Sequence, residues 1–137
     1  MNPQIEGIEA IPGTYPFDLR TSVRTLRINR FFWHLAKQAH RELLLNDPEL
    51  AFTRAGLSEP EKQLVRSRDW LGLVRHGANF FVLEKFARVV RMSNLEVYAA
   101  MRGESLQAFQ RTRNTQALYS VAGRQSGPLD WNPPKTS

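Results

Sequence analysis

At 137 residues, with a net charge of +6 and no cysteine, the chain is long enough for one domain with a real core and short for two. The absence of cysteine excludes disulfides, thiolate metal sites and thiol nucleophiles. No apolar run approaches the roughly 18 residues of a membrane helix, and the acidic start "MNPQIEGIEAIPG" lacks the basic flank and apolar block of a secretory signal. We therefore expect a soluble protein of the cytoplasm.

The first part of the chain predicts an arm followed by a long helix. Residues 1–18 show no hydrophobic periodicity, and the two prolines and the glycine of "IPGTYPFD" predict an extended arm. Residues 22–45 predict one long amphipathic helix, because apolar residues recur there at helical spacing. These apolar residues are Ile28, Phe32, Leu35, Ala39 and Leu43. A second face of this helix carries a basic stripe, with His34 among its members: Arg20, Arg24, Arg27, Arg30, Lys37 and Arg41.

The basic stripe leaves three interpretations open. It is a solvated helix face, a surface that docks onto an acidic protein, or a nucleic-acid site. The sequence contains no zinc-finger spacing, no Gly-aromatic RNA-binding signature and no G-x-x-G clamp. Charge alone therefore does not decide between the three.

Short helices with local start and stop signals follow the long one. Asp47 and Pro48 predict a helix start, and Gly56 predicts its end at residue 55. Ser58 and Glu61 form a capping-box pattern that opens a helix through about residue 67.

Further short helices continue to about residue 114. Asp69 caps a helix over Trp70–His76, which Gly77 ends, and residues 79–91 are apolar at helical spacing. One more helix is expected over Ser93–Met101, closed by Gly103, and Ser105 caps a last one.

The expected fold class is all-α, because no segment alternates with period two and no Asn-Gly or Asp-Gly hairpin occurs. We predict a compact multi-helical domain of short capped helices around one long helix. Its parts are an extended N-terminal arm over residues 1–18, a helical domain over residues 19–114 and a polar C-terminal tail over residues 115–137.

Catalytic patterns are missing from the sequence. His34 and His40 are six residues apart, which places them on different faces of a continuous helix, and no H-x-x-x-H or H-E-x-x-H occurs. The sequence has no G-x-S-x-G elbow and no phosphate-binding loop. The acidic pairs lie at helix starts, where capping explains them. We therefore expect no catalytic residue and no metal held by this chain alone.

Six short motifs in order resemble one known family, over roughly residues 11–110. They are Ile11–Phe17 ("IPGTYPF"), Ile28-Asn29, Gly56-Leu57-Ser58, Arg68-Asp69-Trp70, Gly77-Ala78-Asn79-Phe80 and Ala100–Gly103. Together they resemble the small (alpha) subunit of protocatechuate 4,5-dioxygenase and the equivalent domain of gallate dioxygenases, the LigA family of type II extradiol dioxygenases.

The resemblance implies a division of labour between two subunits. The large (beta) subunit of this class carries Fe(II) held by two histidines and a carboxylate, which binds a catecholic substrate and O₂. The small subunit is a helical cap over that site and supplies no iron ligand. The expected partner is thus an iron-bearing beta subunit, in a heterotetramer, with a catecholic or gallate-like carboxylate bound at the subunit boundary.

The resemblance also gives candidate site residues. Met92, Ser93 and Asn94 are expected to face the substrate, because the family carries a ring-contacting residue near this place. His76 stands just before a joint where the family usually has a pair of glycines. It either contacts substrate or complements the C-terminal dipole of its helix.

Three aromatic residues, Trp70, Phe80 and Phe81, are expected in the core or the subunit interface rather than on the substrate. Asn79 is expected to cap the helix that follows it.

Two rival functions remain open from the sequence. One is a recognition or leader-type binding domain for a peptide-modifying enzyme, with the polar tail as its passenger. The other is a basic nucleic-acid-binding protein, which would show steep salt dependence.

Overall fold

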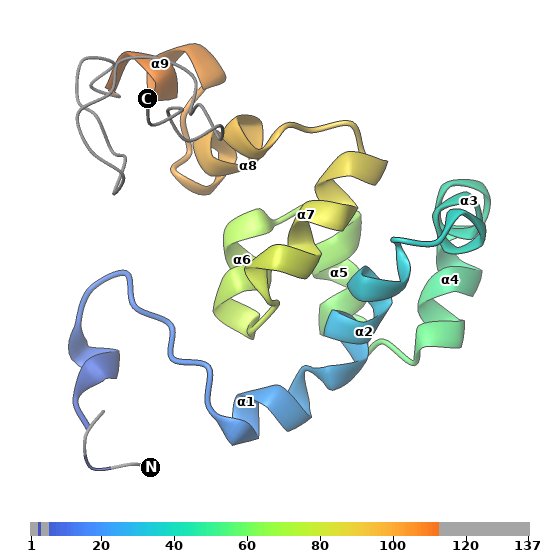
Figure 1. Cartoon of the computed structure of the whole chain (residues 1–137), viewed down its shortest axis with the longest axis horizontal. Coiled ribbons are helices and arrows are strands. Elements are labelled where there is room, and N and C mark those ends of the chain that lie inside the picture. The colour runs from blue at the N-terminus through green and yellow to red at the C-terminus, as the bar shows by residue number, and fades with distance from the viewer. Residues whose placement is uncertain (1–2, 4–5, 113–137) are drawn as a thin grey trace, which may run out of the picture.

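The computed structural model describes residue 3 and residues 6–112, and in this part of the chain it contains helices and no strand, which confirms the all-α class (Figure 1). The helices are the 3₁₀-helix η2 (Ile8–Ala10), α1 (Leu19–Arg24), α2 (Leu26–His34), α3 (Gln38–Asn46), α4 (Pro48–Ala55), α5 (Glu59–Arg66), α6 (Trp70–His76), α7 (Phe80–Val89), α8 (Asn94–Met101) and α9 (Leu106–Thr112).

The prediction of one long helix over residues 22–45 is wrong, because the chain breaks twice within it and forms α1, α2 and α3. At the first break Thr25 is fully buried, and its hydroxyl donates a 2.7 Å hydrogen bond to the carbonyl of Thr21. At the second break Lys37 is extended, with φ −93° and ψ 134°. Arg41 reaches back from α3 and donates to the carbonyls of Leu35 and Ala36, at 3.0 and 2.8 Å. These bonds satisfy acceptors that the end of α2 leaves free.

The second break has a local consequence for two histidines. A continuous helix would hold His34 and His40 on different faces, as the sequence predicted. Because the chain turns between them, the two ring centroids instead lie 4.9 Å apart.

The capping signals of the short helices are confirmed. Asp47 accepts a hydrogen bond from the amide of Leu50 at 3.1 Å, and Asp69 accepts one from Gly72 at 2.9 Å. The helices α5 and α8 both begin with a complete capping box, formed by Ser58 with Glu61 in α5 and by Ser93 with Glu96 in α8. Local hydrogen bonds of this kind fix where each helix starts, whatever it later packs against.

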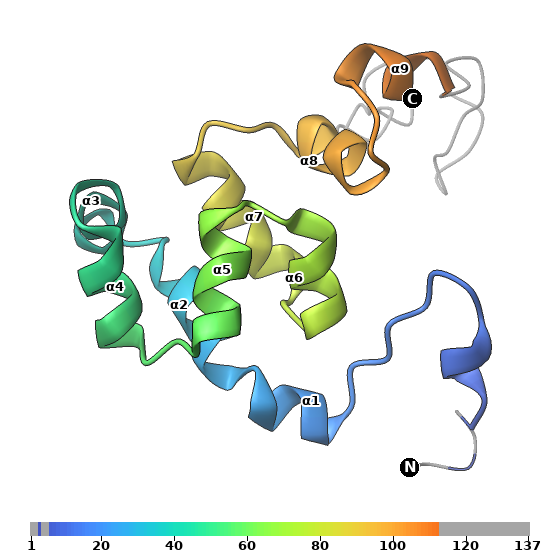
Figure 2. The same ribbon diagram turned by 180° about the vertical axis from the view of Figure 1, so that it is seen from behind.

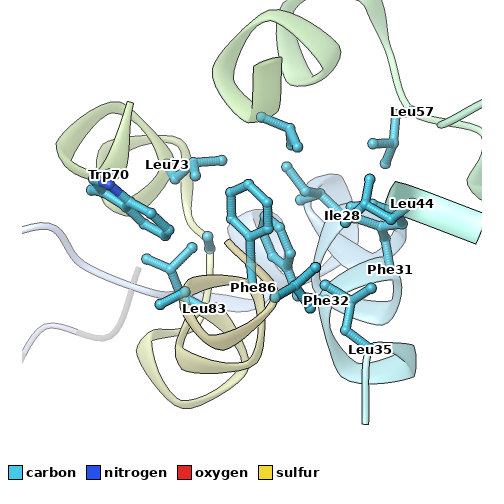
Figure 3. Close-up of a cluster of buried hydrophobic side chains, with 14 of the residues drawn as sticks. Ile28, Phe31, Phe32, Leu35, Leu44, Leu57, Trp70, Leu73, Leu83 and Phe86 are labelled. Atoms are coloured by element: carbon cyan, nitrogen blue, oxygen red, sulfur yellow. The ribbon is translucent and has the colours of Figure 1, made fainter. Parts of the chain in front are cut away.

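The core lies where α2 packs against α7, with α5 and α6 beside them (Figures 1 and 3). Phe86 is at its centre, with ring centroids 5.4 Å from Phe32 and 5.1 Å from Trp70. Figure 3 shows Ile28 and Phe31 on the α2 side of Phe86 and Leu83 near Trp70. The apolar positions of α2 predicted from the sequence, Ile28, Phe32 and Leu35, are all at most 2% exposed.

Two segments extend from this centre in different directions (Figures 1 and 2). The N-terminal arm leads away from α1, and its Tyr15 ring lies 5.8 Å from the Arg75 guanidinium of α6. The pair α8 and α9 lies beyond the end of α7. The predicted tail over residues 115–137 is outside the described residues. None of the helices described is long and apolar enough to cross a membrane.

Candidate functional site

The side chain of Asn29 holds the joint between α6 and α7 against α2. Its amide nitrogen donates to the carbonyl of Gly77 and to the hydroxyl of Thr25, both at 3.1 Å. Its amide oxygen accepts a 2.6 Å hydrogen bond from the backbone N–H of Asn79. Asn79 in turn caps α7 as predicted, by accepting a 2.9 Å bond from the amide of Phe81. The start of α7 is therefore held in one place relative to α2.

Gly77 lets the joint approach the first two helices closely. Its φ is +115°, a conformation that residues with a side chain rarely adopt. A Cβ atom there would lie 2.6 Å from Cγ2 of Thr21 and 2.9 Å from Cγ2 of Thr25. No room exists for a side chain at this position, which explains why a glycine ends α6.

Hydrogen bonds from Arg24 of α1 hold His76 at the end of α6, and the ring faces Glu61 of α5 at a distance too long for a hydrogen bond. Arg24 donates to the carbonyl of His76 at 2.8 Å and to its ring Nδ1 at 3.3 Å. Because arginine only donates, the ring proton sits on Nε2, which faces Oε2 of the buried Glu61 at 3.9 Å. Burial lowers the pKa of His76, against the opposing effect of Glu61. A neutral imidazole at pH 7 does not complement the helix dipole as a cation, so its observed role is to accept the hydrogen bond from Arg24.

Met92, Ser93 and Asn94 lie at the start of α8, a different place from His76. Ser93 caps α8, Met92 packs half-buried against the core, and the Asn94 amide donates to Glu84 Oε1 at 2.9 Å. A crevice beside Asn94 has a volume of about 10 Å³, space for about one water molecule and not for an aromatic ring. In the described part of the chain, no hydrogen bond, ion pair or ring contact joins this segment to His76.

The three predicted interface aromatics separate into different environments. Trp70 is 3% exposed and belongs to the core, the first of the two places expected for it, so almost none of it remains for an interface. The ring of Phe80 stacks on Tyr98 of α8, with centroids 5.6 Å apart. Phe81 is 76% exposed. Of the three, Phe81 has the most surface available for a contact.

An apolar surface that was not predicted from the sequence surrounds Phe81 on α7. We define the apolar surface as Phe17, Leu26, Trp33 and Phe81, whose exposed fractions are 52, 49, 59 and 76%. These residues come from the arm, α2 and α7, and line a shared hollow of about 350 Å³. Asn29 also lines this hollow. Lys85 lies over the Trp33 ring at 5.2 Å. Large apolar groups gathered in this way are typical of a surface that another molecule covers.

A signal for this surface existed in the sequence. Leu26 and Trp33 lie on α2 but away from the face of Ile28, Phe32 and Leu35, so they are apolar residues outside the core stripe. In the described residues, no three histidine or acidic side chains come together as a group that could hold a metal ion.

These features define a small all-helical domain with an ordered joint and an exposed apolar surface beside it. Residues 28–114 match the family described as "Aromatic-ring-opening dioxygenase LigAB, LigA subunit". The match covers more than half of the chain, and the chain belongs to this family, as the sequence motifs predicted. The motif Ile11–Phe17 lies before the matched range.

Among curated proteins, a gallate dioxygenase of Pseudomonas putida (strain KT2440) is 47% identical to the chain over 124 residues. The aligned part is 90% of this chain and 36% of that protein. The chain thus spans only about a third of the length of this relative.

Proposed function

We propose that the chain is the noncatalytic alpha subunit of an Fe(II)-dependent extradiol ring-cleavage dioxygenase and binds a separate LigB-type beta subunit. Membership of the LigA family supports this proposal, as does the 47% identity to part of a gallate dioxygenase. The observation that carries it is the apolar surface, since a member of a subunit family that exposes Trp33 and Phe81 beside an ordered joint has a face suited to a partner.

In this proposal the iron belongs to the beta subunit. The described residues of the chain offer no group of three histidine or acidic side chains for it. The substrate is a catecholic or gallate-like carboxylate held at the subunit boundary in the cytoplasm. The chain acts by covering the site, which excludes water and fixes the orientation of the ring.

The joint held by Asn29 gives this cap a rigid contact surface. Phe81 follows the joint by two residues, so the hydrogen bonds of Asn29 to Gly77 and Asn79 also position Phe81 beside Trp33. A surface that is ordered before docking loses less conformational entropy when it binds. The assembly expected is a heterotetramer.

Direct contact of Met92, Ser93, Asn94 and His76 with substrate stays a prediction. Asn94 would have to exchange its hydrogen bond with Glu84 to reach a ligand. His76 would have to release Arg24. A structural role for these residues predicts that their replacement alters stability more than substrate choice.

The partner is tested by co-expressing the chain with the LigB-type protein encoded nearest to it and measuring the mass of the purified complex by light scattering. A stable complex containing both chains is expected. The chain and the LigB-type protein eluting separately at micromolar concentration would contradict the proposal.

A further inference from the structure

A second hollow is lined by residues of α2, α3 and α4. Figure 1 shows α3 and α4 at the end of the molecule away from the N-terminal arm. This hollow has a volume of about 220 Å³, and its existence depends on the chain break that turns α3 back beside α2. We call it the basic pocket. Its lining residues are Arg27, Arg30, Phe31, His34, His40, Leu43, Ala51, Arg54 and Ala55.

The three arginines of the basic pocket have no acidic partner among the described residues. Arg27 makes only a long hydrogen bond of 3.4 Å to the carbonyl of Gly56, and the ion pairs of the described chain use other cations. No carboxylate lines the basic pocket. Glu42 lines the adjoining open hollow, and its carboxylate already accepts a 2.7 Å bond from Gln38. Uncompensated guanidinium groups around a hollow favour an anion inside it.

The two histidines add donors to the same place. Their ring centroids are 4.9 Å apart, with His34 partly buried and His40 exposed. Burial lowers the pKa of His34, and the positive charges of His40, Lys37 and Arg30 lower it further. Each imidazole carries at least one ring N–H that can donate a hydrogen bond to an anion.

One wall of the basic pocket is apolar. Phe31 and Ala51 are 6 and 5% exposed, and Leu43 and Ala55 complete this wall. A bare inorganic anion would leave this wall without a partner, whereas a carboxylate attached to an apolar body would cover it. The basic pocket lies on a different face of α2 from Leu26 and Trp33.

We propose that the basic pocket binds a small organic carboxylate, with the carboxylate between Arg30, Arg54 and the histidine pair and the apolar body against Phe31 and Leu43. Arginine is suited to this role because its planar fork binds a carboxylate through two parallel hydrogen bonds. This site is independent of the proposed function, because it shares no lining residue with the apolar surface.

The test is a titration of the full chain with benzoate, followed by NMR shifts of backbone amides and histidine ring protons. A Kd of about 1 mM is expected for a ligand of this size. The shifts should centre on His34 and His40, and bound benzoate should raise the pKa of His34. Benzamide, which has the same shape without the charge, should not saturate, and inorganic phosphate should bind more weakly than benzoate.

Matched variants separate the site from the general charge of the protein. Arg30→Gln and Arg54→Gln should each weaken benzoate binding about tenfold, because each removes a charged hydrogen-bond donor. Arg88→Gln makes the same change on the exposed face of α7 and should leave the Kd unchanged. Equal weakening by all three variants, equal binding of benzamide or phosphate, or no saturable binding of benzoate would overturn the proposal.

Discussion

Replacing Phe81 by alanine removes the most exposed aromatic side chain of the apolar surface and tests whether that surface docks onto the beta subunit. Phe81 is 76% exposed. An aromatic side chain buries about 150–250 Å² in an interface. The exposed part of Phe81 thus adds roughly 110–190 Å², worth about 3–5 kcal/mol at ~25 cal/mol per Å² as an upper bound. The entropy lost when the interface becomes ordered reduces this contribution to the binding free energy. Phe81→Ala should therefore cost about 2 kcal/mol of binding free energy, which weakens the complex about 30-fold.

The assay is the Kd of the complex by isothermal titration calorimetry, with thermal unfolding of the isolated chain measured in parallel. Phe81→Ala should not destabilise the chain, because the ring is exposed and alanine has a higher helix propensity. Leu45→Ala is the control: Leu45 is 63% exposed on α3 and lies outside the apolar surface, so its Kd should stay within a factor of two. An unchanged Kd for Phe81→Ala would refute the assignment of this surface.

Three further predictions concern the fold that supports this surface. Gly77→Ala should lower the free energy of unfolding, measured with urea, by about 3 kcal/mol, because alanine would be strained at this positive φ and its Cβ would meet two close contacts. The control is Gly13→Ala, which is also at positive φ but has nothing within 4 Å of the added Cβ. It should lower the same free energy by only about 1 kcal/mol. Ser93→Ala should lower the free energy of unfolding by about 1 kcal/mol, because it removes the capping box of α8. Ser93→Thr keeps a hydroxyl at this position and should retain most of that stability. Because burial lowers the pKa of His76 in the folded chain below its ordinary value of 6.5, the unfolded chain binds more protons as the pH falls below about 6.5. Stability should therefore decrease from pH 7.5 to pH 5.5, and His76→Gln should reduce this decrease; the remainder includes His34, whose pKa is also lowered. An equal decrease in the variant would show that His76 does not contribute.

The parts of the fold that could be predicted are those with local causes. The side chains of Asp47, Ser58, Asp69 and Ser93 start their helices by accepting hydrogen bonds from amides three residues ahead, and these pairs are visible in the sequence. The segment where the helix breaks after Leu35 contains no glycine or proline that would predict the break. It depends on the packing of α3 and on hydrogen bonds from Arg41 to the carbonyls of Leu35 and Ala36, which hydrophobic periodicity does not reveal, so periodicity alone predicted a continuous helix.

The candidate site was predictable only in part, for the same reason. The exposed position of Phe81 follows from its place outside the apolar stripe of α7. Its neighbours Phe17 and Trp33 come from the arm and α2, and only the tertiary fold brings them together. The sequence left both the core and the interface open for Trp70, and its contact with Phe86 places it in the core. The basic pocket likewise depends on the unpredicted turn between His34 and His40.

The ring-opening rate of the LigB-type protein, measured as O₂ uptake with a catecholic carboxylate in the presence and absence of this chain, tests the account most directly. The chain alone should have no activity, and the LigB-type protein alone should have little. Mixing the two should restore a rate that saturates at equal molar amounts. Full activity of the LigB-type protein alone, unchanged by the chain, would contradict the account.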